Sequence, residues 1–264
     1  MKNKKTRKEG IAFLVLWPIV AAFASWVFPS NFFESSILFF AVPGVYLSWR
    51  NPPAIKSALA FSSIFTVAGT GIDYAAVQDK TWSVPTIFPF RIGGAVAVED
   101  VVWFFLLTYM IIAYFEFFYD HLHHKTLGKR MPYLYLITLI TLGCYALLSL
   151  TVGHAYDISY FYLKSGLVLG FFPVLGLLFE FPRLISTFFK TAPYFIAVCF
   201  IEEIVGLHGG YWSFPGSHFI GWVQFGRYRF PFEEFFFWII LFSSTILAYF
   251  EIFDDNRLKF RFRR

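Results

Sequence analysis

The sequence predicts an all-α integral membrane protein with about eight transmembrane helices, and three observations support this fold class. Hydrophobic residues make up 58% of the 264 residues, and the mean hydropathy is +0.60. Asp, Glu, Lys and Arg together make up 15%, compared with about 25% in soluble domains. Several apolar stretches approach the roughly 20 residues that span the hydrocarbon of a bilayer. These observations exclude a soluble enzyme, a disordered tail and a disulfide scaffold.

Each predicted span has a local reason. The first follows a basic N-terminus like that of a signal peptide, but its apolar run is long and no clear small-residue cleavage site follows, so we interpret it as a transmembrane helix. The second and sixth contain mid-span prolines, Pro43 and Pro173, which membrane helices tolerate as kinks. The fifth span has the strongest transmembrane signal because it is uncharged. The seventh has the weakest signal because Lys190 interrupts it. The predicted spans are 11–28, 33–49, 54–72, 99–119, 131–153, 159–179, 184–201 and 233–250.

The distribution of basic residues predicts the orientation. Cytoplasmic loops of membrane proteins are enriched in Lys and Arg. With the N-terminus inside, only five of the 22 basic residues fall outside, and the other 17 lie at the termini, in inner loops or near the inner ends of spans. The sequence therefore predicts a multi-pass protein of the cell membrane with both termini inside. This clustering is a topology signal and does not indicate a nucleic-acid-binding patch. The outer basic residues are Lys80, Arg91, Lys164, Arg227 and Arg229.

An internal repeat divides the chain into a first half, residues 1–128, and a second half, residues 129–264. Each half contains an acid, then a Trp-Ser-x-Pro segment nine residues later, then an acid pair that opens an apolar helix. The loop between the Trp segment and the acid pair is four residues longer in the second half, and the helix that follows contains a further one-residue slip. Each half has four spans, an even number, and we therefore expect two parallel four-helix repeats.

The repeated acids are the candidate catalytic residues. Acidic side chains at the edge of the hydrocarbon cost free energy, so their presence indicates a functional role. A single acid also occurs at helix N-termini because the helix dipole stabilises its negative charge. Adjacent helical residues lie about 100° apart, so we expect one member of each pair to face a bundle cavity and the other to face the loop. A protonated acid in an apolar pocket is a proton donor. The candidates are Glu233, Glu234, Glu99, Asp100, Asp73 and Glu203.

Aromatic residues surround these acids in the sequence, and we expect some of them to bind substrate. Aromatic faces stabilise cations without acting as nucleophiles. A proton donor between aromatic walls suits carbocation chemistry on an apolar alkene. The candidate substrate-binding residues are Trp82, Trp212, Trp103, Phe236 and Trp238.

Other patterns do not predict a cofactor or a metal site. The segment 121–124 contains three His, but the chain has six in all, and membrane di-iron oxygenases need about eight. There is no Gly-rich dinucleotide motif and no Asp-x-x-x-Asp helix face. Cys144 and Cys199 lie inside apolar runs, where we expect free thiols. His208 lies near the second acid group. It either orients a carboxylate or is a loop residue without such a role, and the sequence leaves both open.

At these residues the chain resembles a known family. Pro231, Phe232, Glu233 and Glu234, followed by three Phe, are similar to the Pro-x-Glu-Glu/Asp motif of the heterodimer-type carotenoid (lycopene) cyclases. In that family two homologous pieces form one cyclase, and here both look fused over residues 11–255. The first copy departs from the pattern, because Ala97 stands where Pro is expected. The resemblance implies lycopene or a related acyclic carotenoid as substrate, ring closure without net redox, and no cofactor.

The sequence therefore predicts a carotenoid cyclase, of the intramolecular lyase type, which takes its apolar polyene from the lipid phase. One acid motif donates a proton and the other accepts one, or each motif serves one end group; the sequence leaves both open. The alternatives are a carotenoid end-group hydratase, a proton-coupled transporter and a non-catalytic carotenoid-binding partner. Expected partners are membrane lipids and other carotenoid-pathway enzymes, and the sequence does not predict an oligomeric state.

Overall fold

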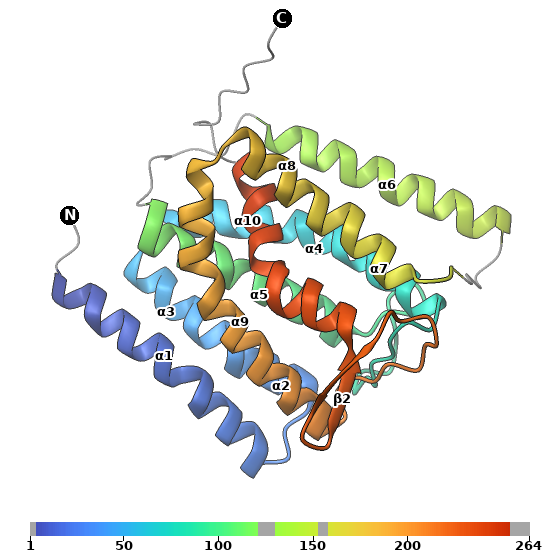
Figure 1. Ribbon diagram of the computed structural model, residues 1–264, viewed down its shortest axis with the longest axis horizontal. Helices are drawn as coiled ribbons and strands as arrows, with labels where there is room; N and C mark the ends of the chain where they lie inside the picture. Colours follow the sequence, from blue (N-terminus) through green and yellow to red (C-terminus); the bar gives the residue numbers. More distant parts are fainter. Residues whose placement is uncertain (1–3, 121–129, 153–157, 254–264) are drawn as a thin grey trace, which may run out of the picture.

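The structure is a helical bundle in which α5 lies near the centre (Figure 1). The computed structural model describes residues 4–120, 130–152 and 158–253. Some helices contain a π-helical or 3₁₀ segment, labelled η. In chain order the helical elements are α1 (Lys4–Val27), α2 (Phe32–Ser36), η1 (Ile37–Ala41), α3 (Val42–Arg50), η2 (Pro52–Ala54), α4 (Ile55–Gln78), α5 (Val98–Phe115), η3 (Glu116–Asp120), α6 (Met131–Val152), α7 (Phe161–Gly166), η4 (Leu167–Phe171), α8 (Phe172–Glu180), α9 (Arg183–Gly209), η5 (Glu234–Leu241) and α10 (Phe242–Phe253).

The predicted fold class is confirmed. Seven of the described helices are long and apolar enough to cross a membrane, and α6 adds a further apolar helix. The side chains of α1 that face outward are large and apolar, such as Phe23, which is 68% exposed. An exposed surface of this kind is suited to lipid rather than to water. The protein is therefore an all-α membrane protein.

Two helices extend further than the sequence predicts. The predicted spans ended at residues 72 and 201, just before the first acid of each half, whereas α4 continues to Gln78 and α9 to Gly209. An acid is costly within the hydrocarbon, and each of these apolar runs is therefore interrupted in the sequence at its acid. The helices continue because neighbouring side chains satisfy these carboxyls by hydrogen bonds. Asp73 and Glu203 therefore lie inside helices rather than at their ends.

Proline accounts for matching irregularities in the two halves. The π-helical segments η1 and η4 occupy corresponding positions of the repeat, and Pro43 and Pro173 each follow shortly after them. Proline lacks the N–H that would complete the helical hydrogen bonds of the preceding turn. The helices then end at Asn51 (φ −141°, ψ 61°) and Phe181 (φ −129°, ψ 71°), each of which precedes another proline. The residue before a proline is disfavoured in the α region, which explains both ends.

The one-residue slip in the second acid helix has a structural explanation. The segment η5 is π-helical over Glu234–Leu241, whereas α5 is α-helical over the matching stretch. A π-helical turn holds more residues than an α-helical one, because its hydrogen bonds connect residues five apart. The additional residue between the acid pair and the helix end is thus taken up in η5 without displacing either end.

The longer loop of the second half forms a hairpin that the sequence analysis did not predict. Strands β1 (Trp222–Phe225) and β2 (Tyr228–Pro231) pair antiparallel, and Gly226 takes a positive φ of 57° in the turn. The Trp-Ser-x-Pro segments of the two loops also pair with each other. The N–H of Ser83 donates to the carbonyl of Ser213, and the N–H of Ser213 donates to that of Ser83, both at 2.9 Å. Both acid loops therefore lie at the same end of the bundle.

The two predicted halves are not separate packing units. Helix α1 packs against α9, α5 against α10, and α6 against α4, so that each of these contacts joins the first half to the second. Figure 1 shows α1 beside α9 and α6 at the edge of the bundle. The division at residues 128 and 129 stays a prediction, and the boundary itself falls outside the described residues.

Candidate active site

A cavity of about 310 Å³ lies between the two halves of the chain, below the two acid loops. Helices α4, α5, α6, α7, α9 and α10 and segments η4 and η5 all contribute to its wall, together with Phe32 of α2 and residues of both loops. Its lining is predominantly apolar, with Trp and Phe side chains along most of its length. The cavity is of the size of the smaller ligand pockets of proteins, which range over roughly 300–1,000 Å³.

The cavity brings together one acid from each predicted pair and both of the acids that precede the Trp segments. Asp73 of α4 and Asp100 of α5 line it from the first half. Glu203 of α9 and Glu234 of η5 line it from the second half. The two acid motifs, which lie far apart in the sequence, therefore face one shared space rather than two separate sites.

The other member of each pair points away from the cavity and holds its loop. The carboxylate of Glu99 accepts the Ile87 N–H at 2.7 Å and the Thr86 hydroxyl at 2.8 Å. The carboxylate of Glu233 accepts the Ile220 N–H at 2.8 Å. Both residues are buried, at 1% and 0% exposure, and neither lines the cavity. Both are candidate catalytic residues from the sequence, and their carboxylates bond to the loops, in line with the separation of about 100° between adjacent helical residues.

Tryptophan N–H groups hold three of the cavity carboxyls. Trp82 Nε1 donates to Asp73 Oδ1 at 2.6 Å, and Trp212 Nε1 donates to Glu203 Oε1 at 3.2 Å. In both cases the Trp follows its acid by nine residues, the spacing that the repeat shows. Trp103 Nε1 donates to Glu202 Oε1 at 2.7 Å across the two halves.

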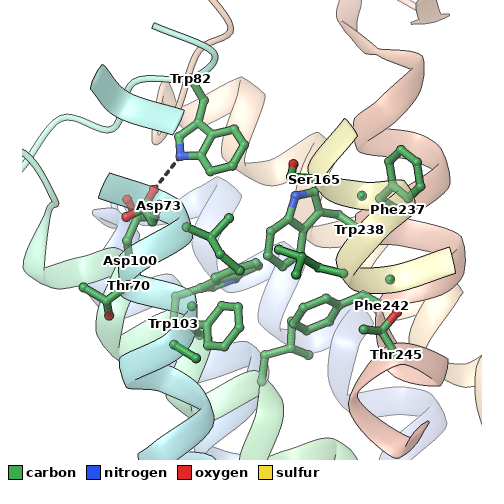
Figure 2. A pocket seen from close by; sticks show the side chains of 18 of the residues that line it. Thr70, Asp73, Trp82, Asp100, Trp103, Ser165, Phe237, Trp238, Phe242 and Thr245 are labelled. Carbon is green, nitrogen blue, oxygen red and sulfur yellow. Dashed lines mark hydrogen bonds between the residues drawn. The ribbon is translucent and has the colours of Figure 1, made fainter. Parts of the chain in front are cut away.

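The carboxyls of Asp73 and Asp100 face each other in the cavity wall (Figure 2). Two neighbouring carboxylates in an apolar wall repel each other, so the pair favours a state in which one of the two carries a proton. Neither Oδ2 atom receives a bond from an N–H or hydroxyl donor of the described residues. Both residues are partly accessible because they line the cavity. This pair therefore offers an acidic proton at the wall of an apolar space.

Each Trp also packs against the opposite half. The Trp82 ring meets the Tyr162 ring edge-on at 5.2 Å between centroids, and the Trp212 ring meets Phe32 edge-on at 5.1 Å. Tyr162 and Phe32 occupy matching positions in the register that aligns the two Trp segments. The two loops are thus anchored in each other's half, which fixes the acids of one half relative to those of the other.

Aromatic rings form the wall opposite the aspartates. Trp103 and Trp238 are 5.4 Å apart between centroids, and Phe242 packs on Trp238 at 4.5 Å. Figure 2 shows Trp238 and Phe242 across from the aspartates, with Trp103 below Asp100. Of the candidate substrate-binding residues, four line the cavity: Trp82, Trp103, Trp212 and Trp238. Phe236 does not line the cavity; it packs on Phe232, and its neighbour Phe237 takes the place in the wall.

Glu202 and Tyr162, which take part in the hydrogen bonds of the cavity carboxyls, are not among the sequence-based candidates. Glu202 lines the cavity and is 3% exposed. Its signal was visible, since Glu202 and Glu203 form a third acid pair inside an apolar run. The Tyr162 hydroxyl donates to Glu234 Oε2 at 2.6 Å. No sequence motif marks Tyr162, and only its match to Phe32 across the repeat could have drawn attention to it.

Other sequence-based candidates lie elsewhere. His208 lies in α9, where its ring stacks on Trp26 at 4.0 Å and its Nδ1 contacts the Arg227 guanidinium at 2.7 Å, so it orients none of the carboxylates of the described residues. Cys199 is a free, buried thiol in the cavity wall. The His-containing segment 121–124 lies outside the described residues. Within the described part of the chain, no group of three or more His, Cys, Asp or Glu could hold a metal ion.

The geometry suits proton transfer to an apolar ligand. Carboxyl groups on two sides can exchange protons with a molecule between them, and the aromatic faces of the wall stabilise positive charge on it. Water-excluding apolar walls strengthen both interactions.

Part of the chain is similar to a known protein. Over 108 residues it is 34% identical to a bifunctional lycopene cyclase/phytoene synthase of Phaffia rhodozyma, and the match covers 37% of this chain and 16% of that protein. The chain thus corresponds to a small part of that longer relative. No family model and no solved structure matches the chain.

Proposed function

We propose that this chain is a membrane carotenoid cyclase, of the intramolecular lyase type, in the cell membrane. It closes a linear end group of lycopene or a related acyclic carotenoid by acid-initiated, non-redox cyclisation. The observation that carries the proposal is the single apolar cavity lined by Asp73, Asp100, Glu203 and Glu234. The similarity to a protein named as a bifunctional lycopene cyclase supports the substrate class.

The proposed reaction uses the two acid groups in turn. A carboxylic acid protonates the terminal double bond of the end group and gives a tertiary cation. The neighbouring double bond attacks this cation and closes the ring. A carboxylate then removes a ring proton and restores a double bond. Product and substrate are isomers, so the reaction requires no electron carrier and no net proton.

The aromatic wall and the helical walls have separate roles in this proposal. Trp103 and Trp238 stabilise the cation through their ring faces while water is excluded. The remaining polyene extends toward Thr138 of α6 and Tyr249 of α10, which line the cavity away from the aspartates. Helix α6 lies at the edge of the bundle and packs mainly against one helix, α4. In this proposal the polyene therefore enters the cavity from lipid beside α6.

The fused repeat fits the same function. Each half supplies acids to the cavity and a Trp that packs on the other half, so neither half makes a complete site alone. We propose that residues 1–128 and 129–264 correspond to the two pieces of the heterodimer-type cyclases. Association with other carotenoid-pathway enzymes is a further expectation of this function.

Expression in lycopene-producing cells, followed by pigment analysis, tests the proposal. We expect cyclic carotenoids, and one deuterium per ring when purified protein acts on acyclic carotenoid in D₂O without added flavin, nicotinamide or metal. Asp100→Asn should lower turnover by about 10²–10⁴-fold. Glu116→Gln, which changes a buried acid outside the cavity wall, serves as the matched control. Hydroxylated acyclic products would instead identify a hydratase, and unchanged lycopene would contradict the proposal.

A further inference from the structure

The two halves supply acids of the same kind to the cavity but surround them with different hydrogen-bond partners. In the first half, the carboxyls of Asp73 and Asp100 face each other, and their buried Oδ2 atoms have no hydrogen-bond partner among the described residues. Trp82 Nε1 donates to Asp73 Oδ1 at 2.6 Å. Two ionised carboxyls side by side in an apolar wall would repel each other, so the pair favours a state in which one aspartate holds a proton. Figure 2 shows the pair facing each other beside the Trp82 indole.

In the second half, the glutamates accept from separate neutral donors. Tyr162 donates its hydroxyl proton to Glu234 Oε2 at 2.6 Å, and Trp212 Nε1 donates to Glu203 at 3.2 Å. These donors complement a carboxylate, which only accepts hydrogen bonds. The second half is thus built to receive a proton, and the first half is built to hold one.

Tyr162 creates this difference between the halves. Its matching residue in the first half is Phe32, which has no hydroxyl. Tyr162 is 3% exposed, and the Trp82 ring meets it edge-on at 5.2 Å, so its ring is fixed by the first half while its hydroxyl holds Glu234 in the second.

We infer that the Asp73–Asp100 pair donates the proton that starts the reaction, and that the Glu234 carboxylate removes the ring proton that ends it. Tyr162 is the positioning residue that aims Glu234. The inference rests on the proposed cyclisation and assigns its direction. An aspartate O–H bond breaks as a C–H bond forms on the alkene. At the end a ring C–H bond breaks, its electron pair becomes the new double bond, and the proton goes to Glu234.

Each turnover leaves the aspartate pair one proton short and Glu234 one proton richer. Exchange with water at the loop end of the cavity restores both groups. Because the incoming proton comes from this exchange, each ring carries one solvent hydrogen. The identity of the ring proton removed sets the position of the double bond, and it depends on where the Glu234 carboxylate is held.

The inference predicts different signatures for the two groups. Tyr162→Phe removes the donor to Glu234 and should change the ratio of ring double-bond isomers, with turnover lower by about ten-fold. Glu234→Asp withdraws the carboxylate by one methylene and should change the same ratio. Both variants should keep one deuterium per ring from D₂O. Asp100→Asn should lower turnover by about 10²–10⁴-fold and leave the isomer ratio of the residual product unchanged.

Tyr109→Phe is the matched control. The Tyr109 hydroxyl also bonds a side chain of another helix, Ser48 of α3, at 2.5 Å, but Tyr109 does not line this cavity. We expect it to change neither turnover nor isomer ratio.

Three outcomes would overturn the assignment. The first is an isomer ratio that changes in Asp100→Asn but not in Tyr162→Phe, which would reverse the roles. The second is a Tyr162→Phe protein with wild-type turnover and ratio. The third is an unchanged ratio in both Tyr162→Phe and Glu234→Asp. These results differ from a failure of the proposed function, in which the wild-type protein itself forms no ring.

Discussion

Gly206 allows a side chain of the site to approach a helix closely, and this makes Gly206→Ala a quantitative test of the structure. Gly206 lies on α9, three residues after Glu203. A Cβ atom at this position would lie 2.2 Å from Cη2 of Trp212, whereas ordinary contact begins at 3.4 Å. The indole must therefore move by more than an ångström to restore ordinary contact.

This movement breaks the hydrogen bond that holds Glu203. Trp212 Nε1 lies 3.2 Å from Glu203 Oε1, at the long end of the usual range, so a further displacement leaves no bond. Overpacking costs about 1–3 kcal/mol, and the lost bond to a carboxyl group costs about 1.5–3 kcal/mol. The better helix propensity of Ala offsets up to about 1 kcal/mol. We expect a net destabilisation of about 2–5 kcal/mol, or roughly 5–15 °C in melting temperature.

A double-mutant cycle in detergent measures this effect. Trp212→Phe removes the ring atoms that the new Cβ meets, so Gly206→Ala should cost about 1–3 kcal/mol less in that background. Gly176→Ala is the control, because a Cβ there meets nothing within 4 Å, and its effect should stay within about 1 kcal/mol. The reasoning is refuted if Gly206→Ala is as mild as Gly176→Ala, or if its cost is the same with Phe at position 212.

Other predictions follow from the same contacts. Glu99→Gln should lower the melting temperature by loosening its loop and should retain far more turnover than Asp100→Asn, as paired thermal and kinetic measurements will show. Trp103→Phe should reduce turnover by about ten-fold or more, since Glu202 loses its N–H donor, and pigment analysis at equal protein level checks it. Cysteines placed at Lys80 and Arg227 should be labelled from the non-cytoplasmic side; labelling of either from the cytoplasm alone would contradict the predicted orientation.

The sequence predicts the fold class because the relevant signals are local. Apolar length and low charge determine that the chain crosses a membrane, and these features are read without knowledge of any contact. The mid-span prolines at 43 and 173 mark where the helices become irregular. The one-residue slip between the acid pair and the helix end is the sequence counterpart of η5.

The site is less accessible to sequence reasoning because it depends on contacts between distant segments. Helical geometry predicts that Glu99 and Asp100 point in different directions, but not which of them meets the cavity. Tyr162 lies 72 residues from Glu234, and only packing brings its hydroxyl there. The longer second loop is visible as an insertion. Apolar and polar residues alternate on both sides of Gly226, but each strand is only four residues long, which makes the pattern a weak signal.

The residues that differ between the two halves of the repeat explain how the proposed reaction has a direction. A reaction that begins with proton donation and ends with proton removal needs two groups in opposite protonation states at the same time. Two identical half-sites around one cavity could share one proton, but nothing would set which half holds it and which half receives one. Phe32 matches Tyr162, and Ile72 matches Glu202, in the register that aligns the two Trp segments, and both pairs break this equivalence. We propose that the common backbone places the acids, and that these few unequal side chains give the reaction its direction.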